Sequence, residues 1–172
     1  MHKNKTSLAV LDITLIATMT AVLEVSKRVL DAIPNVELIS VLFIVFTLCL
    51  GVKKTLISSV AFAITECAVF GISTWTITYF YVWPILVLAT YGFRRANSKI
   101  VFSILSAFFG LFFGMLCSLV TLFIGGLKLA ISWWAAGITY DIVHCISNFV
   151  ICLVLFDPLV FALKELTKKY SI

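Results

Sequence analysis

The chain has 172 residues, of which 62% are hydrophobic and only 12% charged, and its formal net charge is +5. Soluble globular domains are about half apolar and about a quarter charged, so this composition leaves too little polar surface to cover a water-exposed globule. It favours an all-α integral membrane protein with a single domain over residues 1–172, because six spans of about 20 residues use the whole length.

Six apolar stretches follow one another along the chain, and each predicts a transmembrane helix. Pro84 predicts a kink in the fourth stretch, since proline removes one backbone hydrogen bond. Gly125 and Gly126 predict a break between the fifth and sixth stretches. Residues 159–172 are amphipathic and basic, and we expect them to form a cytoplasmic tail along the inner membrane surface. The expected spans are 8–30, 36–52, 54–71, 75–93, 100–124 and 131–156.

The basic residues predict the orientation of this six-helix bundle. Of the 13 Lys and Arg residues, only Lys27, Arg28 and Lys128 lie near the first, third or fifth loop. The others lie at the N-terminus, in the second and fourth loops and in the C-terminal tail. Cytoplasmic loops carry the excess of Lys and Arg, so both termini are predicted to be cytoplasmic. The same spread over the loops argues against a nucleic-acid-binding surface.

The sixth stretch carries a polar stripe. At 100° per residue, Trp134, Gly137, Asp141, His144 and Asn148 fall within about 80° on one helix face. An aspartate costs roughly 2.5–3.5 kcal/mol near the centre of a membrane helix, so such a stripe faces protein or water. Asp141 and His144 are three apart and can contact each other. Three interpretations stay open: a satisfied structural pair, a wall of a ligand site, or the acid–base pair of an intramembrane enzyme.

Other candidate binding residues are a buried acid and several aromatic side chains. Glu66 lies deep in the third stretch, and both a ligand-facing and a structural role stay open for it. Tyr79 and Trp83 share a face of the fourth stretch, either as part of an interfacial belt or as a wall for a flat ligand. Trp133 and Tyr140 flank the polar stripe.

The sequence lacks the motifs of a nucleotide-hydrolysing site and of a metal centre. Without a G-x-x-x-x-G-K-[ST] loop, the chain is expected to hydrolyse no nucleotide and to hold no catalytic residue. Two histidines are too few for a His-rich metal site, and the five cysteines lie in apolar runs without a C-x-x-C pair. We therefore expect no metal and no intrinsic cofactor. No inverted repeat is visible, which argues against a self-contained secondary transporter.

Two pairs of small residues predict close contacts between helices. They are Ala17-x-x-x-Ala21 in the first stretch and Gly110-x-x-x-Gly114 in the fifth. Small side chains at this spacing let a neighbouring backbone approach closely.

These features together resemble a known family. The alanine pair, the segments PNVEL at 34–38 and WWAAGI at 133–138, and six short helices with both termini inside are similar to the substrate-binding S component of energy-coupling factor (ECF) vitamin transporters. The resemblance implies a vitamin receptor in the bacterial plasma membrane. It also implies three partner subunits, a transmembrane coupling protein and two cytoplasmic ATPases. Ala17 and Ala21 are then expected to pack against the coupling protein, and transport to proceed by toppling of the S component in the bilayer.

Within that family the chain most resembles the cobalamin-specific members, which makes cobalamin the expected transported ligand. A riboflavin- or folate-like vitamin stays open, as does a structural membrane protein of the cell-shape machinery with a similar bundle. The expected substrate-binding residues are Glu66, Tyr79, Trp83, Trp133, Trp134, Tyr140, Asp141, His144 and Asn148.

Overall fold

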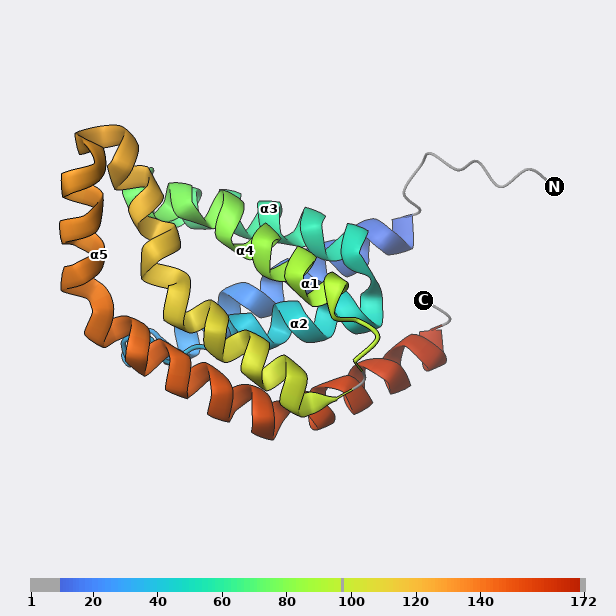
Figure 1. Cartoon of the computed structure of the whole chain (residues 1–172). Coiled ribbons are helices and arrows are strands. Elements are labelled where there is room, and N and C mark those ends of the chain that lie inside the picture. The colour runs from blue at the N-terminus through green and yellow to red at the C-terminus, as the bar shows by residue number, and fades with distance from the viewer. Residues whose placement is uncertain (1–9, 97, 171–172) are drawn as a thin grey trace.

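The structure, a computed structural model, describes residues 10–96 and 98–170, and these form an all-α fold (Figure 1). Predictions that involve residues 1–9, 97 and 171–172, including the start of the first span and the end of the tail, lie outside the described residues. The helices are α1 (Val10–Leu30), α2 (Ile39–Leu50), α3 (Val52–Phe70), α4 (Thr74–Gly92) and α5 (Lys99–Tyr170).

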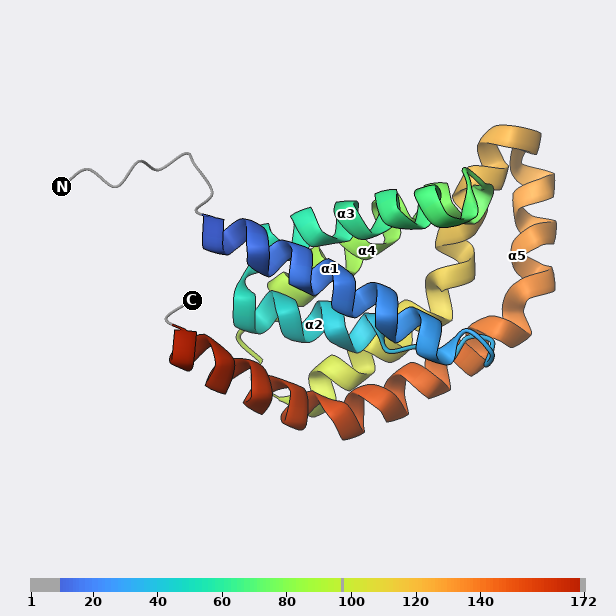
Figure 2. The same cartoon turned by 180° about the vertical axis from the view of Figure 1, so that it is seen from behind.

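The helices run up and down between two ends of one bundle. Figures 1 and 2 show that α1 begins and α5 finishes at the same end, which we call the terminal end. The α1–α2 connection, the α3–α4 turn and a sharp bend in α5 lie at the opposite end, the loop end. Each connection outside the helices is short, so consecutive helices are antiparallel neighbours.

Two glycines and a capping box define the tight turns of the first four helices. Gly51 (φ 96°) separates α2 from α3, and Gly71 (φ 80°) ends α3; both adopt positive φ values that other residues rarely take. At the start of α4, the Ser73 hydroxyl accepts a hydrogen bond from the Thr76 amide, and the Ser73 amide donates to the Thr76 hydroxyl. This capping box satisfies amides that the first turn of a helix leaves unpaired.

The long helix α5 corrects the prediction of six separate helices, because the described residues contain five. Only Gly125 (φ −138°, ψ 15°) and Gly126 (φ 76°, ψ −177°) leave the helical conformation, at the bend of α5. The fifth and sixth predicted stretches are therefore two limbs of one element, residues 99–124 and 127–170. Two residues suffice for the bend because glycine tolerates the positive φ of Gly126.

The helix also continues where a separate tail was expected. Pro158 lies inside α5, which runs on to Tyr170. A proline inside a helix costs about 3 kcal/mol or more. Beyond it, Leu159, Val160 and Leu163 pack against the core, and this burial compensates for the lost hydrogen bond. Tertiary packing thus decides where this helix ends.

The core is built around α2. Every residue from Ile39 to Thr47 is buried, as expected for a helix that is apolar on all sides. Trp83 of α4 stacks on Phe43 of α2, with ring centroids 5.2 Å apart, and its ring also contacts Phe109 and Phe113 of α5. These rings form a central aromatic cluster that reaches toward the loop end.

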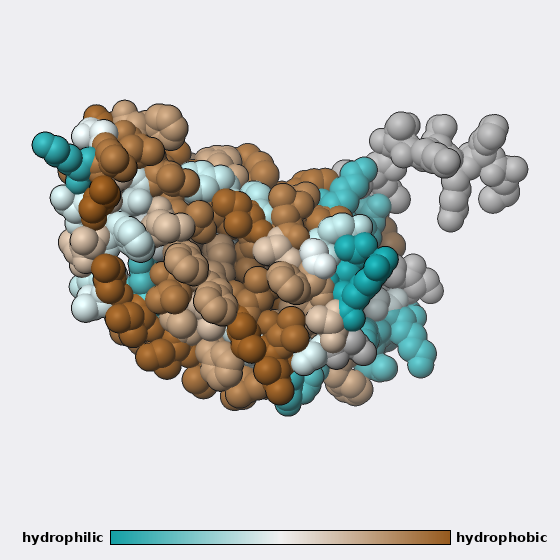
Figure 3. Space-filling view, viewed as in Figure 1, coloured by the Kyte–Doolittle hydropathy of each residue, from teal (hydrophilic) through white to brown (hydrophobic). Residues whose placement is uncertain are grey.

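The outside of the bundle is largely apolar. Figure 3 shows apolar side chains over the middle of the molecule, with strongly hydrophilic residues mostly at the terminal end and a smaller group near the bend of α5. At the terminal end, ion pairs join Lys54 to Asp12 and Lys99 to Asp157. By length and composition, α5 alone among the described helices could cross a membrane; α2 is also apolar but has only 12 residues. One such helix is weak evidence for a membrane protein.

Candidate functional site: a cavity under the α1–α2 connection

A cavity of about 240 Å³ lies under the α1–α2 connection. Its wall comes from one continuous segment and two more distant helices. The segment from the end of α1 to the start of α2 contributes Lys27, Leu30, residues 31 and 33–37, and Ile39; α4 contributes Tyr79 and Trp83, and α5 contributes Phe113 and His144. The cavity therefore exists only when this segment, α4 and both limbs of α5 are packed together.

A carboxylate and an imidazole meet in the wall of this cavity. Oε1 of Glu37 lies 3.3 Å from Nε2 of His144, and Oε2 of Glu37 accepts a hydrogen bond of 2.8 Å from the Ser40 amide. Glu37 thus caps the first turn of α2, where a negative charge is favoured. The Glu37–His144 contact is an ion pair when the imidazole is protonated.

The imidazole is held in place and keeps one nitrogen free. His144 is 3% exposed, and its ring packs edge-to-face against Phe113 with centroids 5.0 Å apart. Its Nδ1 has no hydrogen-bond partner among the described residues. Trp83 is 2% exposed, and its Nε1 also has no hydrogen-bond partner among the described residues. Buried polar atoms are normally paired. The described residues contain eight buried side-chain atoms without a hydrogen-bond partner, and these two belong to residues that line the cavity.

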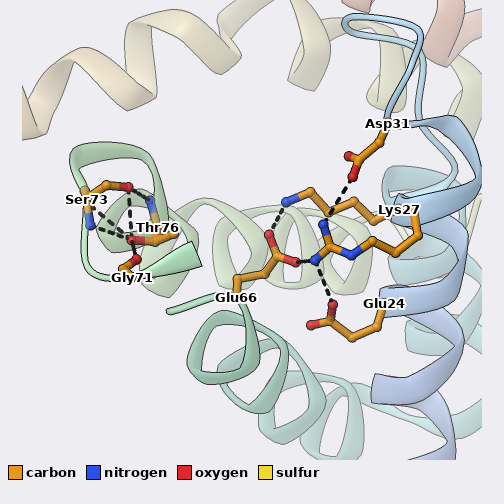
Figure 4. A network of polar contacts seen from close by, with 8 residues as sticks. Glu24, Lys27, Asp31, Glu66, Gly71, Ser73 and Thr76 are labelled. Carbon is orange, nitrogen blue, oxygen red and sulfur yellow. Dashed lines mark hydrogen bonds and ion pairs between the residues drawn. The ribbon is translucent and has the colours of Figure 1, made fainter. Parts of the chain in front are cut away.

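An ion network borders the cavity at the ends of α1 and α3 (Figure 4). Glu66 is fully buried; one of its oxygens contacts Nζ of Lys27, and the other accepts a 2.6 Å bond from Arg28. Arg28 also pairs with Glu24 and Asp31. Lys27 and Asp31 line the cavity, whereas Glu66 does not. Glu66, predicted as a substrate-binding residue, is thus the buried counter-ion of two cations and does not line the cavity.

The ammonium of Lys27 is enclosed by rings as well as by Glu66. Its Nζ lies 4.5 Å from the ring centroid of Trp75, 5.0 Å from that of Tyr79 and 5.2 Å from that of Phe70. Cation–π contacts of this kind add to the ion pair. The positive charge of Lys27 is therefore paired within the protein, with the Glu66 carboxylate and the aromatic rings around it.

Of the three residues Asp141, His144 and Asn148 in the predicted polar stripe, only His144 lines the cavity. His144 reaches the cavity. Asp141 does not: its Oδ1 accepts a 2.9 Å hydrogen bond from the Gly114 amide. The amide of Asn148 donates to the Ser40 hydroxyl and, more weakly, to the Ser106 carbonyl. The hydrogen-bond partner of His144 is thus Glu37 rather than Asp141.

The Gly110-x-x-x-Gly114 spacing explains how the two limbs of α5 come so close. A Cβ at Gly110 would lie 2.8 Å from the backbone of His144, and one at Gly114 would lie 2.5 Å from the Asp141 carboxylate. Real Cβ atoms essentially never make such contacts. The two glycines therefore let the second limb bring His144 against the core.

Of the other predicted residues, Tyr79 and Trp83 line the cavity, whereas the tryptophans and the tyrosine of α5 do not. Trp133 and Tyr140 are exposed on α5, and Trp134 is half-buried with an unpartnered Nε1 among the described atoms. Ala17 and Ala21 lie on an exposed face of α1.

Sequence reasoning missed five polar or aromatic residues of the wall. One signal for Glu37 was available: it lies three residues before Ser40, at the start of the apolar run of α2, where a carboxylate can cap a helix. The missed residues are Lys27, Asp31, Asn35, Glu37 and Phe113.

Within residues 10–96 and 98–170, no group of three or more His, Cys, Asp and Glu side chains is arranged to hold a metal ion. Comparison of the chain with protein-family models, with curated proteins and with solved structures found no match.

Proposed function

We propose that this chain is the membrane-embedded S component of an ECF-type importer, and that it binds a vitamin in the cavity under the α1–α2 connection. The observation that carries the proposal is the composition of the cavity wall, in which Tyr79, Trp83 and Phe113 lie together with the Glu37–His144 pair. Ligand sites typically combine apolar and aromatic walls with a few placed polar groups.

The arrangement of the helices supports a bundle that spans a membrane. Each limb of α5 is long enough to count as a span, since residues 99–124 rise about 39 Å at 1.5 Å per residue. In the proposed arrangement, α1 to α4 and the two limbs of α5 would supply six passes, with α2 as a short one of 12 residues. The beginning of α1 and the end of α5 lie at the same end of the bundle. Most basic loops lie at that terminal end, which would face the cytoplasm. The cavity then faces the outside, where a receptor meets its ligand.

The two exposed alanines support the proposal that a partner protein packs against α1. Ala17 and Ala21 present a smooth strip that the described residues leave uncovered, and small residues favour close helix packing in membranes. Because the chain has no nucleotide-binding loop, energy would come from two cytoplasmic ATPases acting through a transmembrane coupling protein. Ligand delivery would follow the toppling motion implied by the family resemblance.

The size of the cavity bears on which vitamin binds. A volume of about 240 Å³ is below the range of about 300–1,000 Å³ that holds drug-sized ligands. Cobalamin is larger than such ligands, so it would require the α1–α2 connection to move away from α5. A smaller flat vitamin fits the cavity without such a movement, and we place it ahead of cobalamin.

The test is ligand-induced stabilisation of the purified full-length chain in detergent. Cobalamin, riboflavin, folate and smaller vitamins are added separately, and the shift in thermal unfolding is measured. A true ligand at 100 times its Kd stabilises by about 2.7 kcal/mol. Co-purification with a coupling protein and ATPases, followed by ATP-dependent uptake in proteoliposomes, tests the transport role. If no vitamin stabilises the chain and no module co-purifies, the structural membrane protein becomes the better interpretation.

A further inference from the structure

We propose that a groove between α1, α2 and the end of α5 binds one acyl chain of an anionic phospholipid, whose headgroup is held by lysines at the terminal end. The inference rests on the membrane placement in the proposed function. It does not rest on the vitamin-binding role of the cavity, which lies at the loop end.

The groove lies between two helices that do not touch. Among the described residues, no Cα atom of α1 comes within 8 Å of one in α5, and α2 lies between them (Figure 2). The resulting hollow has a volume of about 250 Å³ and shares no lining residue with the cavity under the α1–α2 connection. Met19 and Phe46 on its floor are buried, whereas Val22 and Leu166 on its two sides are exposed. The groove is therefore open to whatever surrounds the bundle.

The surface of the groove is apolar. Two threonines line it, but the Thr18 hydroxyl donates to the Thr14 carbonyl, and the Thr167 hydroxyl donates to the Lys164 carbonyl. The other lining residues are leucine, valine, methionine and phenylalanine. A polar ligand would give up hydrogen bonds to water here without replacement, which is unfavourable. A hydrocarbon chain gives up none and gains burial of apolar surface.

The size of the groove favours an acyl chain over a helix of a partner protein. A helix with its side chains is about 10 Å across, so one turn of about 5.4 Å occupies about 400 Å³. Such a helix could lie across a groove of about 250 Å³ but not inside it. A single acyl chain is narrow enough to enter and to contact the floor, which a helix lying across would leave as a void.

One side of the groove leads to basic residues. Leu166 lines both the groove and a second depression at the end of α5. The other residues of that depression include Lys168, Lys169 and Glu165. Its two positive charges thus exceed its single acid, and they lie at the terminal end of the bundle.

Lys164 adds a further positive charge on the side of α2. It follows a residue of the groove wall and acts electrostatically on Cys49 near the end of α2. Among the described residues, neither Lys164 nor Lys168 forms an ion pair. Lysines at the membrane surface attract anionic lipid headgroups. A lipid with its acyl chain in the groove therefore has its phosphate beside these lysines.

The test compares two lipids with the same acyl chains, dioleoyl phosphatidylglycerol (anionic) and dioleoyl phosphatidylcholine (zwitterionic). Their binding to the unmodified full-length chain in detergent is measured by native mass spectrometry over a lipid titration. A lysine at the surface favours an anionic headgroup by about fivefold, so phosphatidylglycerol should bind at least that much more tightly. Glycerol 3-phosphate, which lacks acyl chains, should not bind.

A variant of α1 assigns the acyl chain to the groove. Val22→Trp places a large ring in the groove and should weaken binding of both lipids. Val25→Trp is the matched control on the same helix, because Val25 is exposed and does not line the groove. It should leave both affinities within about twofold.

A second pair of variants assigns the headgroup preference to the lysines. Lys164→Gln combined with Lys168→Gln should abolish the preference for phosphatidylglycerol while both lipids still bind. Arg94→Gln combined with Arg95→Gln removes the same charge after α4, away from the groove, and should leave the preference unchanged.

The outcomes separate this inference from the proposed function. Equal affinities for the two lipids, binding of glycerol 3-phosphate as tight as that of phosphatidylglycerol, or lipid binding that survives Val22→Trp overturns the inference. So does a Val22→Trp variant that loses the coupling protein but keeps the lipid, since the groove then belongs to the partner protein. Failure of the vitamin role appears differently, as the absence of stabilisation by every vitamin while phosphatidylglycerol still binds.

Discussion

Glu37 and His144 are 107 positions apart in the sequence, yet Oε1 of the first lies 3.3 Å from Nε2 of the second. The contact joins the start of α2 to the second limb of α5 and forms one side of the cavity. It places a carboxyl group next to an imidazole whose Nδ1 has no hydrogen-bond partner among the described residues. The predictions below test this contact, the packing that permits it, and the interfaces that the proposed function requires.

The Glu37–His144 contact should appear as energetic coupling. In a double-mutant cycle of Glu37→Gln and His144→Ala, we expect an interaction free energy of about 1 kcal/mol, within the roughly 0.5–3 kcal/mol seen for residues in contact. Thermal unfolding in detergent without ligand provides the measurement. A cycle of Glu37→Gln with Asp157→Asn is the control and should be additive. Additivity in the first cycle would show that the contact contributes nothing to folding.

Replacing Gly114 by alanine should destabilise the bundle. The new Cβ would meet the Asp141 carboxylate at 2.5 Å, and overpacking of this kind costs about 1–3 kcal/mol. Gly137→Ala in the same helix is the matched control, because nothing lies within 4 Å of its Cβ position; a helical Gly-to-Ala change there stabilises by roughly 0.5–1 kcal/mol. We therefore expect the unfolding temperature to fall in Gly114→Ala and to rise in Gly137→Ala.

A second variant shows whether the Gly114 effect arises at Asp141. In Gly114→Ala combined with Asp141→Ala, the clashing carboxylate is removed, so part of the lost stability should return. If the double variant is as unstable as the sum of the single ones, the two limbs do not meet at these residues.

Glu66→Gln should destabilise the chain even without ligand. It removes the shared counter-ion of Lys27 and Arg28, and breaking a buried ion pair on one side costs about 3–5 kcal/mol. Asp157→Asn breaks the exposed pair with Lys99 and should cost about 0–1 kcal/mol. Thermal unfolding of the two variants, compared with the unmodified chain, gives the difference. Equal small effects would mean that Glu66 is not a structural counter-ion.

Enlarging the alanine strip should separate ligand binding from assembly. Ala17→Leu combined with Ala21→Leu adds bulk on the exposed face of α1, so association with the coupling protein should fall while vitamin binding stays within twofold. Ala135→Leu with Ala136→Leu is a matched change on an exposed part of α5. Co-purification and ligand-induced stabilisation are measured for both. Unchanged assembly of the α1 variant would remove this strip from the proposed interface.

The positions of the first four helices follow from local chemistry. The predicted stretches 54–71 and 75–93 correspond to α3 (Val52–Phe70) and α4 (Thr74–Gly92) within two residues. Glycine at 51 and 71 and the capping box at Ser73 set their limits through backbone geometry that neighbouring residues decide. The extent of α5 does not follow from such signals, since its passage through Pro158 depends on packing of the residues beyond it.

The sequence by itself determined the all-α class and most helix boundaries, and three of its candidate residues, His144, Tyr79 and Trp83, line the cavity. The tertiary structure decided which groups meet there. Spacing predicted a pair between Asp141 and His144, but the close approach of Gly114 gives Asp141 a backbone donor and leaves His144 to Glu37. The physical reason is that helix propensity and capping act over a few residues, whereas the partner of a buried side chain depends on which distant segments pack against it.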